Sequence, residues 1–230
     1  MDRSARKPAG GTRRRGRRPT PTAPLPREVV EDVRAAAGGR GNRAVTLLEE
    51  AVAALDRDRL RDAIRAAREA KVLAGRSGAV REVLGIALYR RGRYREALRE
   101  LQAYRRMTGR PDQNHLIADS HRALGAPEKA LPLVREALDA RMSAEARAEA
   151  AVVGGSALAD LGRYEEALTL LRRFEPGAEA ARPHDLRVWY VIGDVLERAG
   201  RAREATRAFQ QVVRHDPDAF DAAERLSALS

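Results

Sequence analysis

The 230-residue chain contains no cysteine, and only 4% of its residues are aromatic. Without cysteine it cannot form a disulfide framework, a cysteine-ligated metal site or a cysteine nucleophile. An uninterrupted apolar run of about 18 residues, which a membrane-spanning helix needs, is also missing. The four histidines lack metal-ligand spacing, and no Gly-Lys-Ser/Thr loop or Ser-His-Asp arrangement occurs. We therefore expect a protein that is not an enzyme and has no metal or cofactor.

The net charge of +11 is concentrated near the N-terminus. Residues 1–28 hold nine basic and two acidic residues, which leaves a nearly balanced remainder. Residues 1–26 contain five prolines and no apolar periodicity, so they are predicted to be a disordered basic tail. No apolar stretch follows the charges as a secretory signal requires, so a cytoplasmic location is expected. The excess of arginine over lysine and the many alanines are typical of a GC-rich bacterial genome.

From Arg27 onward the apolar residues follow helical spacing, and one motif recurs. Its clearest copies begin at Leu84 and Trp189. From the end of the expected first helix, at Leu88 and Leu196, both copies follow the pattern large–x3–Gly–x–Tyr/Ala–x2–Ala–x3–large. Two further copies surround Gly125 and Gly162, and a degenerate copy begins at Asp58. The alanines that anchor the second helix of each copy are Ala63, Ala97, Ala130, Ala167 and Ala205. Their spacing of 33–38 residues indicates a repeat of two helices.

This motif and period resemble the tetratricopeptide repeat (TPR) family, whose repeat is about 34 residues. The resemblance covers roughly residues 44–217 and implies an all-α fold, a right-handed α-solenoid of about five helix-turn-helix units. The units are expected at about 44–77, 78–110, 111–143, 144–182 and 183–217. A capping helix is expected within 218–230, and an extra helix over Glu28–Ala37 completes a solenoid of residues 27–230.

The motif also predicts how the helices pack. Glycines are expected in a left-handed conformation just past each first helix, at Gly92, Gly125, Gly162 and Gly200. The anchoring alanines allow close helix contact, while Leu101, Val134, Leu171 and Phe209 are expected to fill the seam with the neighbouring unit. Extra residues near Ala140–Ser143 and Pro176–Asp185 predict long or distorted connections. Pro132 lies inside a second helix and predicts a kink or a helix that starts late.

The TPR resemblance implies a non-catalytic scaffold that holds a peptide or helix of another protein against the first helices of its units. The expected groove residues are Glu82, Ile86, Tyr89, His115, Asp119, Arg122, Ser156, Asp160, Tyr190, Asp194 and Glu197. Repeat proteins that capture acidic C-termini present lysine and asparagine at such positions, whereas these are mostly acidic or neutral. We therefore expect a neutral or basic ligand with one apolar anchor near Tyr89 or Tyr190, with a preference weakened by neighbouring arginines. Segment 13–18 of the same chain is a candidate competitor.

The basic tail supports an alternative function. Arg13, Arg14, Arg15, Arg17 and Arg18 could neutralise phosphates and tether an RNA- or ribosome-associated factor. No aromatic residue precedes Tyr89, so the tail has no platform on which bases could stack. A disordered leader without a ligand explains the same composition, and self-association of the repeats also stays open.

Overall fold

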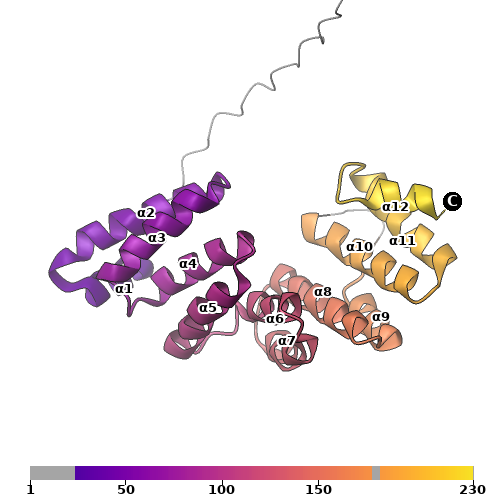
Figure 1. Cartoon of the computed structure of the whole chain (residues 1–230), viewed down its shortest axis with the longest axis horizontal. Helices are drawn as coiled ribbons and strands as arrows, with labels where there is room; N and C mark the ends of the chain where they lie inside the picture. Colours follow the sequence, from indigo (N-terminus) through magenta and orange to yellow (C-terminus); the bar gives the residue numbers. More distant parts are fainter. Residues whose placement is uncertain (1–23, 178–181, 230) are drawn as a thin grey trace, which may run out of the picture.

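Antiparallel helix pairs follow one another along the chain in the computed structural model, which describes residues 24–177 and 182–229 (Figure 1). The first two pairs are α2 (Gly41–Asp56) with α3 (Leu60–Leu73), and α4 (Gly78–Arg90) with α5 (Tyr94–Thr108). They are followed by α6 (Asn114–Ala123) with α7 (Ala130–Asp139), α8 (Ala144–Asp160) with α9 (Tyr164–Arg172), and α10 (Pro183–Arg198) with α11 (Ala202–His215). Helix α1 (Arg27–Ala37) precedes the pairs and α12 (Ala222–Ala228) follows them. The all-α solenoid prediction is confirmed.

The pairs form an arc with an inner and an outer side (Figure 1). Helices α4, α6, α8 and α10, the first helices of their pairs, lie along the inside of the arc. Helices α5, α7 and α9 lie on the outside. One pair cannot bury its apolar face alone, so stacking of the pairs supplies the core.

The tight turns within the pairs follow the glycine prediction. Gly92, Gly125, Gly162 and Gly200 have φ angles of 75°, 76°, 73° and 75°. In the second pair, the Gly92 amide donates to the Tyr89 carbonyl at 2.8 Å, and the Arg93 amide donates to the Leu88 carbonyl at 2.9 Å. A left-handed residue at this point satisfies carbonyls at the helix end and reverses the chain.

Small residues bring the two helices of a pair together. All five anchoring alanines are fully buried. A Cβ added to Gly193 of α10 would lie 2.7 Å from the Phe209 ring of α11, and Gly85 and Gly155 have the same relation to Leu101 and Leu171. These large residues therefore pack on a glycine of their own unit. Val134 of α7 instead lies against Gly154 of α8 in the next unit, where an added Cβ would lie 2.7 Å from it, as the seam prediction expects.

Pro132 does not kink its helix, because α7 starts late. A 3-10 turn (Pro127–Lys129) precedes α7, and Pro132 is the third residue of that helix. Amides in the first turn have no intrahelical acceptor, so the missing N–H is tolerated. Helix α9 ends at Arg172 and α10 begins at Pro183, so the chain between them is long, as expected, and its residues 178–181 lie outside the described residues. The connection at 140–143, also expected to be long, has the same length as the connection at 74–77 between α3 and α4. The extra residues instead lengthen α8, which has 17 residues against 13 in α4.

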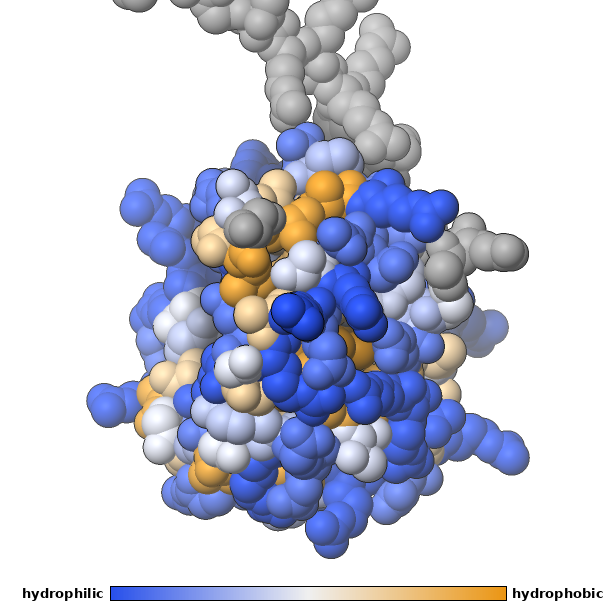
Figure 2. Space-filling view, turned by 90° about the vertical axis from the view of Figure 1, so that its right-hand side faces the viewer, coloured by the Kyte–Doolittle hydropathy of each residue, from blue (hydrophilic) through white to orange (hydrophobic). Residues whose placement is uncertain are grey.

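Both ends of the solenoid differ slightly from prediction. Leu25 packs against the cluster around buried Val33, and the Pro26 carbonyl accepts hydrogen bonds from Val29 and Val30, so the folded part begins before residue 27. The predicted disorder of residues 1–23 lies outside the described residues. At the other end, α12 is shorter than the predicted cap over 218–230, and Ala222 is its buried contact. The end face seen in Figure 2 is mainly hydrophilic, as expected of a cap, and apolar residues gather in its upper part.

Among the described helices, none combines the length and apolarity needed to cross a membrane.

Candidate functional site

A cavity of about 380 Å³ lies on the inner side of the arc, between α6, α8, α10 and the segment before α12. Five of the predicted groove residues line it, namely Asp119, Arg122, Ser156, Tyr190 and Asp194. Its apolar lining comes from Val152 and Val153 of α8, Val191 of α10 and Phe220. The volume falls in the range of ordinary ligand sites and suits a few side chains of a bound segment.

A continuous row of ion pairs connects the inner helices across this cavity. Arg122 of α6 bonds Asp119 at 2.9 Å and reaches Asp160 of α8, also at 2.9 Å. Arg198 of α10 approaches the same Asp160 at 3.1 Å and Asp194 at 3.6 Å. Because each carboxylate already faces an arginine, the groove is close to neutral in charge. The expected preference for a basic ligand is correspondingly weak and stays a prediction.

The row ends on a cluster built around Arg225 of α12. Arg225 bonds Asp194 at 2.9 Å and Glu197 at 2.7 Å, and it donates to the Tyr190 hydroxyl at 3.2 Å. Burial disfavours the charged guanidinium, but bonds to Tyr190, Glu197 and Asp194 outweigh this and raise the pKa of Arg225. The α12 cap is thereby tied to α10 at the edge of the groove.

Both tyrosines expected to anchor a ligand use their hydroxyls within the protein. Tyr89 donates to Asp119 at 2.5 Å, and Tyr190 donates to Asp221 at 2.6 Å. Burial, and then these hydrogen bonds to carboxylates, raise the pKa of both hydroxyls. Both side chains therefore stay neutral and fixed, and of the two rings only that of Tyr190 lines the cavity.

Phe220 is the most unusual residue of the site. Its φ of 57° is a left-handed conformation that a bulky side chain rarely adopts, and its side chain is 51% exposed. The ring lies 4.7 Å from the Tyr190 ring, measured between centroids. An exposed aromatic side chain held over a cavity in a strained conformation is typical of a functional surface.

The other predicted groove residues lie outside this cavity. Glu82 accepts a hydrogen bond from Gln113 at 2.7 Å, and His115 contacts the Asp112 carbonyl at 3.1 Å. Ile86 packs against the core cluster that contains Leu84, Leu88 and Leu101. Tyr89, Asp160 and Glu197 join the site only through their bonds to Asp119, Arg122, Arg198 and Arg225.

Sequence reasoning missed four lining residues on α8 and α10, namely Val152, Val153, Arg187 and Val191. Helical spacing of three or four residues from Ser156, Tyr190 and Asp194 would have found them. Phe220 and Arg225 carried no such signal, because they lie outside the repeat motif and come into the site through the cap.

No three metal-ligating side chains converge anywhere within residues 24–177 and 182–229. Burial raises the pKa of Glu149, but its contact with Arg187 at 2.9 Å opposes that effect. Burial also lowers the pKa of His115, so this ring is neutral near pH 7.

Comparison with known proteins supports the fold. Residues 116–219 match a family model described as Tetratrico peptide repeat. Among solved structures, YrrB, described as a TPR protein with an unusual peptide-binding site, has a TM-score of 0.56 at 19% identity over 85% of this chain and 97% of its own. TTC0263, a thermophilic TPR protein from Thermus thermophilus, has a TM-score of 0.65 at 16% identity, with 81% and 98% covered. The apo quorum sensor NprR from B. thuringiensis has a TM-score of 0.66 at 14% identity, with 87% and 62% covered. No curated protein matches the chain.

Proposed function

We propose that this chain, which has the fold of tetratricopeptide-repeat proteins and matches their family model over residues 116–219, is a non-catalytic interaction scaffold whose inner groove binds a peptide or helix of another protein. The observation that carries this proposal is the cavity of about 380 Å³ with Phe220 held half-exposed over it. YrrB, which has a similar fold, is described as having a peptide-binding site, and this supports the same class of ligand.

The lining suggests what the ligand presents. Val191, Tyr190 and Phe220 offer an apolar seat, whereas the carboxylates around it are paired with arginines. A segment with one aliphatic or aromatic side chain therefore gains most from burial here, about 1.5–3 kcal/mol for a large side chain. Charged neighbours on the ligand contribute less, because the ion pairs are partly exposed and screened by salt.

A peptide-display selection against the full-length protein would test this proposal. Selected peptides should lose binding to Ser156→Arg, which places a long cation in the cavity, but should bind Thr169→Arg normally. Thr169 lies exposed on the outer helix α9 and makes only a bond to its own helix, so it is a matched control. Equal binding to the wild type and to Ser156→Arg would contradict a groove ligand.

The alternative function through the basic tail needs a separate readout. A pull-down with and without nuclease distinguishes the two, because partners held by nucleic acid are lost on nuclease treatment. Loss of all partners would favour the RNA- or ribosome-associated function over the groove.

A further inference from the structure

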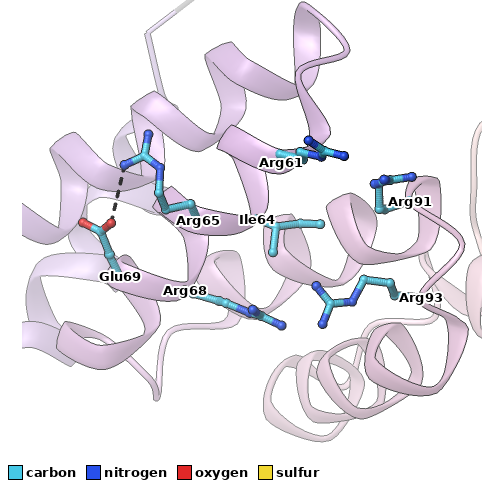
Figure 3. A pocket seen from close by; sticks show the side chains of 7 residues that line it. All are labelled: Arg61, Ile64, Arg65, Arg68, Glu69, Arg91 and Arg93. Atoms are coloured by element: carbon cyan, nitrogen blue, oxygen red, sulfur yellow. Dashed lines mark ion pairs between the residues drawn. The ribbon is translucent and has the colours of Figure 1, made fainter.

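A second, larger cavity of about 710 Å³ lies away from the inner groove, beside α3 and the turn between α4 and α5. Five arginines, one glutamate and Ile64 line it (Figure 3). Figure 3 shows Arg61 facing Arg91 and Arg68 facing Arg93, with Ile64 between the two pairs. The lining thus carries a formal charge of +4 around a small apolar floor.

The arginines differ in how they are balanced. Arg68 and Arg93 share Glu96, at 2.8 and 2.6 Å, and Arg65 approaches Glu69 at 3.5 Å. The side chains of Arg61 and Arg91 have no hydrogen bond or ion pair with any described residue. Asp58 and Asp62 line an adjoining pocket together with these two arginines, but Asp58 pairs with Arg90, and Asp62 pairs with Arg59 and Arg65. Two like charges that face each other without an ion pair repel, so an anion between them would relieve an unfavourable arrangement.

The repeat supplies an internal control for this site. Where the fourth and fifth units meet, Arg201 bonds Glu204 at 2.7 Å and Glu165 at 2.9 Å. The matching residues of the first two units, counted from the anchoring alanines and turn glycines, are Arg93, Glu96 and Arg61. The Arg201–Glu204 pair is therefore kept as Arg93–Glu96, but Arg61 stands in place of the Glu165 carboxylate.

A second exchange adds to the same effect. Arg91 matches Ala199, the residue just before the turn glycine of the fifth unit. Replacing a carboxylate by a guanidinium adds two positive charges, and replacing alanine by arginine adds a third. The first interface thus lacks the counter-ion that the last one contains, and the missing partner is an acidic group.

We propose that this cavity, the Arg61–Arg91 site, binds an acidic peptide segment of a partner protein, with a carboxylate between the two free guanidiniums and an aliphatic side chain over Ile64. Arginine forks match carboxylates in geometry as well as charge. Only two guanidiniums are unpaired among the described residues that line the cavity, which suits one or two acidic side chains better than a phosphate backbone. The seven lining residues include no aromatic ring on which a base could stack.

The test measures fluorescence anisotropy of a labelled peptide of alternating glutamate and leucine with the full-length protein. The key variant is Arg61→Glu with Arg91→Ala, which recreates the arrangement at the last interface and should therefore fold normally. We expect it to weaken peptide binding by about tenfold, with the wild-type affinity falling as salt is raised. A thermal melt checks that the variant is folded.

The matched control is Arg106→Glu with Arg135→Ala, which changes the net charge by the same amount. Both arginine side chains are exposed and unpaired within the described part of the chain. The tail is identical in both variants, so its contribution to binding cancels. Equal weakening by the two variants would overturn the proposal, because binding would then depend only on net charge.

Two further measurements distinguish this site from a nucleic-acid site and from the inner groove. A labelled octauridylate tests nucleic acid: if Arg61→Glu with Arg91→Ala weakens RNA binding but not peptide binding, the site is for phosphates and the proposal is wrong. Ser156→Arg in the inner groove should leave binding of the acidic peptide unchanged. Loss of that binding in Ser156→Arg would place the peptide in the groove and overturn the Arg61–Arg91 site while leaving the groove proposal intact.

Discussion

Replacing Gly193 by alanine tests whether close packing between α10 and α11 is what requires the glycine. A Cβ at this position would lie 2.7–2.9 Å from three atoms of the Phe209 ring, which is fully buried and cannot move freely. Alanine favours a helix over glycine by about 1 kcal/mol, so on local propensity alone the change would stabilise. Overpacking of a rigid core costs about 1–3 kcal/mol. We expect the steric cost to win, with Gly193→Ala destabilising the wild type.

The same substitution should reverse its sign when the ring is absent. Phe209→Ala by itself should cost about 3–5 kcal/mol through lost burial and the cavity it leaves. In that background the added methyl group of Gly193→Ala finds free space, so its helix propensity should make it neutral or stabilising. The cycle therefore predicts a coupling free energy of about 2 kcal/mol between the two positions.

Urea unfolding followed by circular dichroism and by tryptophan fluorescence measures this cycle. The single tryptophan, Trp189, is 2% exposed and lies on α10 itself, so its emission reports the affected unit separately from the remaining repeats. Gln210→Ala on the exposed side of α11 is the control and should change stability by less than about 0.5 kcal/mol. The packing argument would be refuted if Gly193→Ala stabilised the wild type, or if its cost were unchanged beside Phe209→Ala.

Four other outcomes are expected. Removal of residues 1–23 should leave the melting temperature unchanged. Removal of residues 1–26 should lower the free energy of unfolding by about 1 kcal/mol, because Leu25 packs against the cluster around Val33. Calorimetry compares the two truncations. Ala167→Leu should destabilise by about 1–3 kcal/mol in chemical unfolding, while Thr169→Leu, exposed on the same helix, should not. Burial lowers the pKa of His115 in the folded protein, so as the pH falls below 6.5 the unfolded chain binds the proton first and the free energy of unfolding decreases. In urea titrations at several pH values, His115→Gln should make this decrease shallower. Phe220→Gly should relieve backbone strain of about 1 kcal/mol and so cost little stability, yet it should weaken the peptides selected on the groove in a binding titration.

Much of the fold was predictable because the repeat motif acts locally. A glycine two residues before Tyr94 or Tyr164 ends one helix and starts the next whatever surrounds it, and an alanine every 33–38 residues sets the spacing of the pairs. The same spacing placed the eleven expected groove residues on the first helices, which line the inside of the arc. Pro132 could be read as a kink or a late start, and only the 3-10 turn before α7 decided between them.

The sequence by itself determined the all-α repeat, its register and the helices that carry the groove, since these depend on helical period and turn residues. Only the tertiary structure decided which side chains meet, because contacts between α6, α8, α10 and α12 join residues far apart in the chain. It paired the acidic residues of the groove with Arg122, Arg198 and Arg225, and it brought Phe220 over the cavity. It also left Arg61 and Arg91 facing each other without a counter-ion among the described residues, which the composition of α3 alone does not reveal, since Arg68 on the same helix has an acidic partner across the interface.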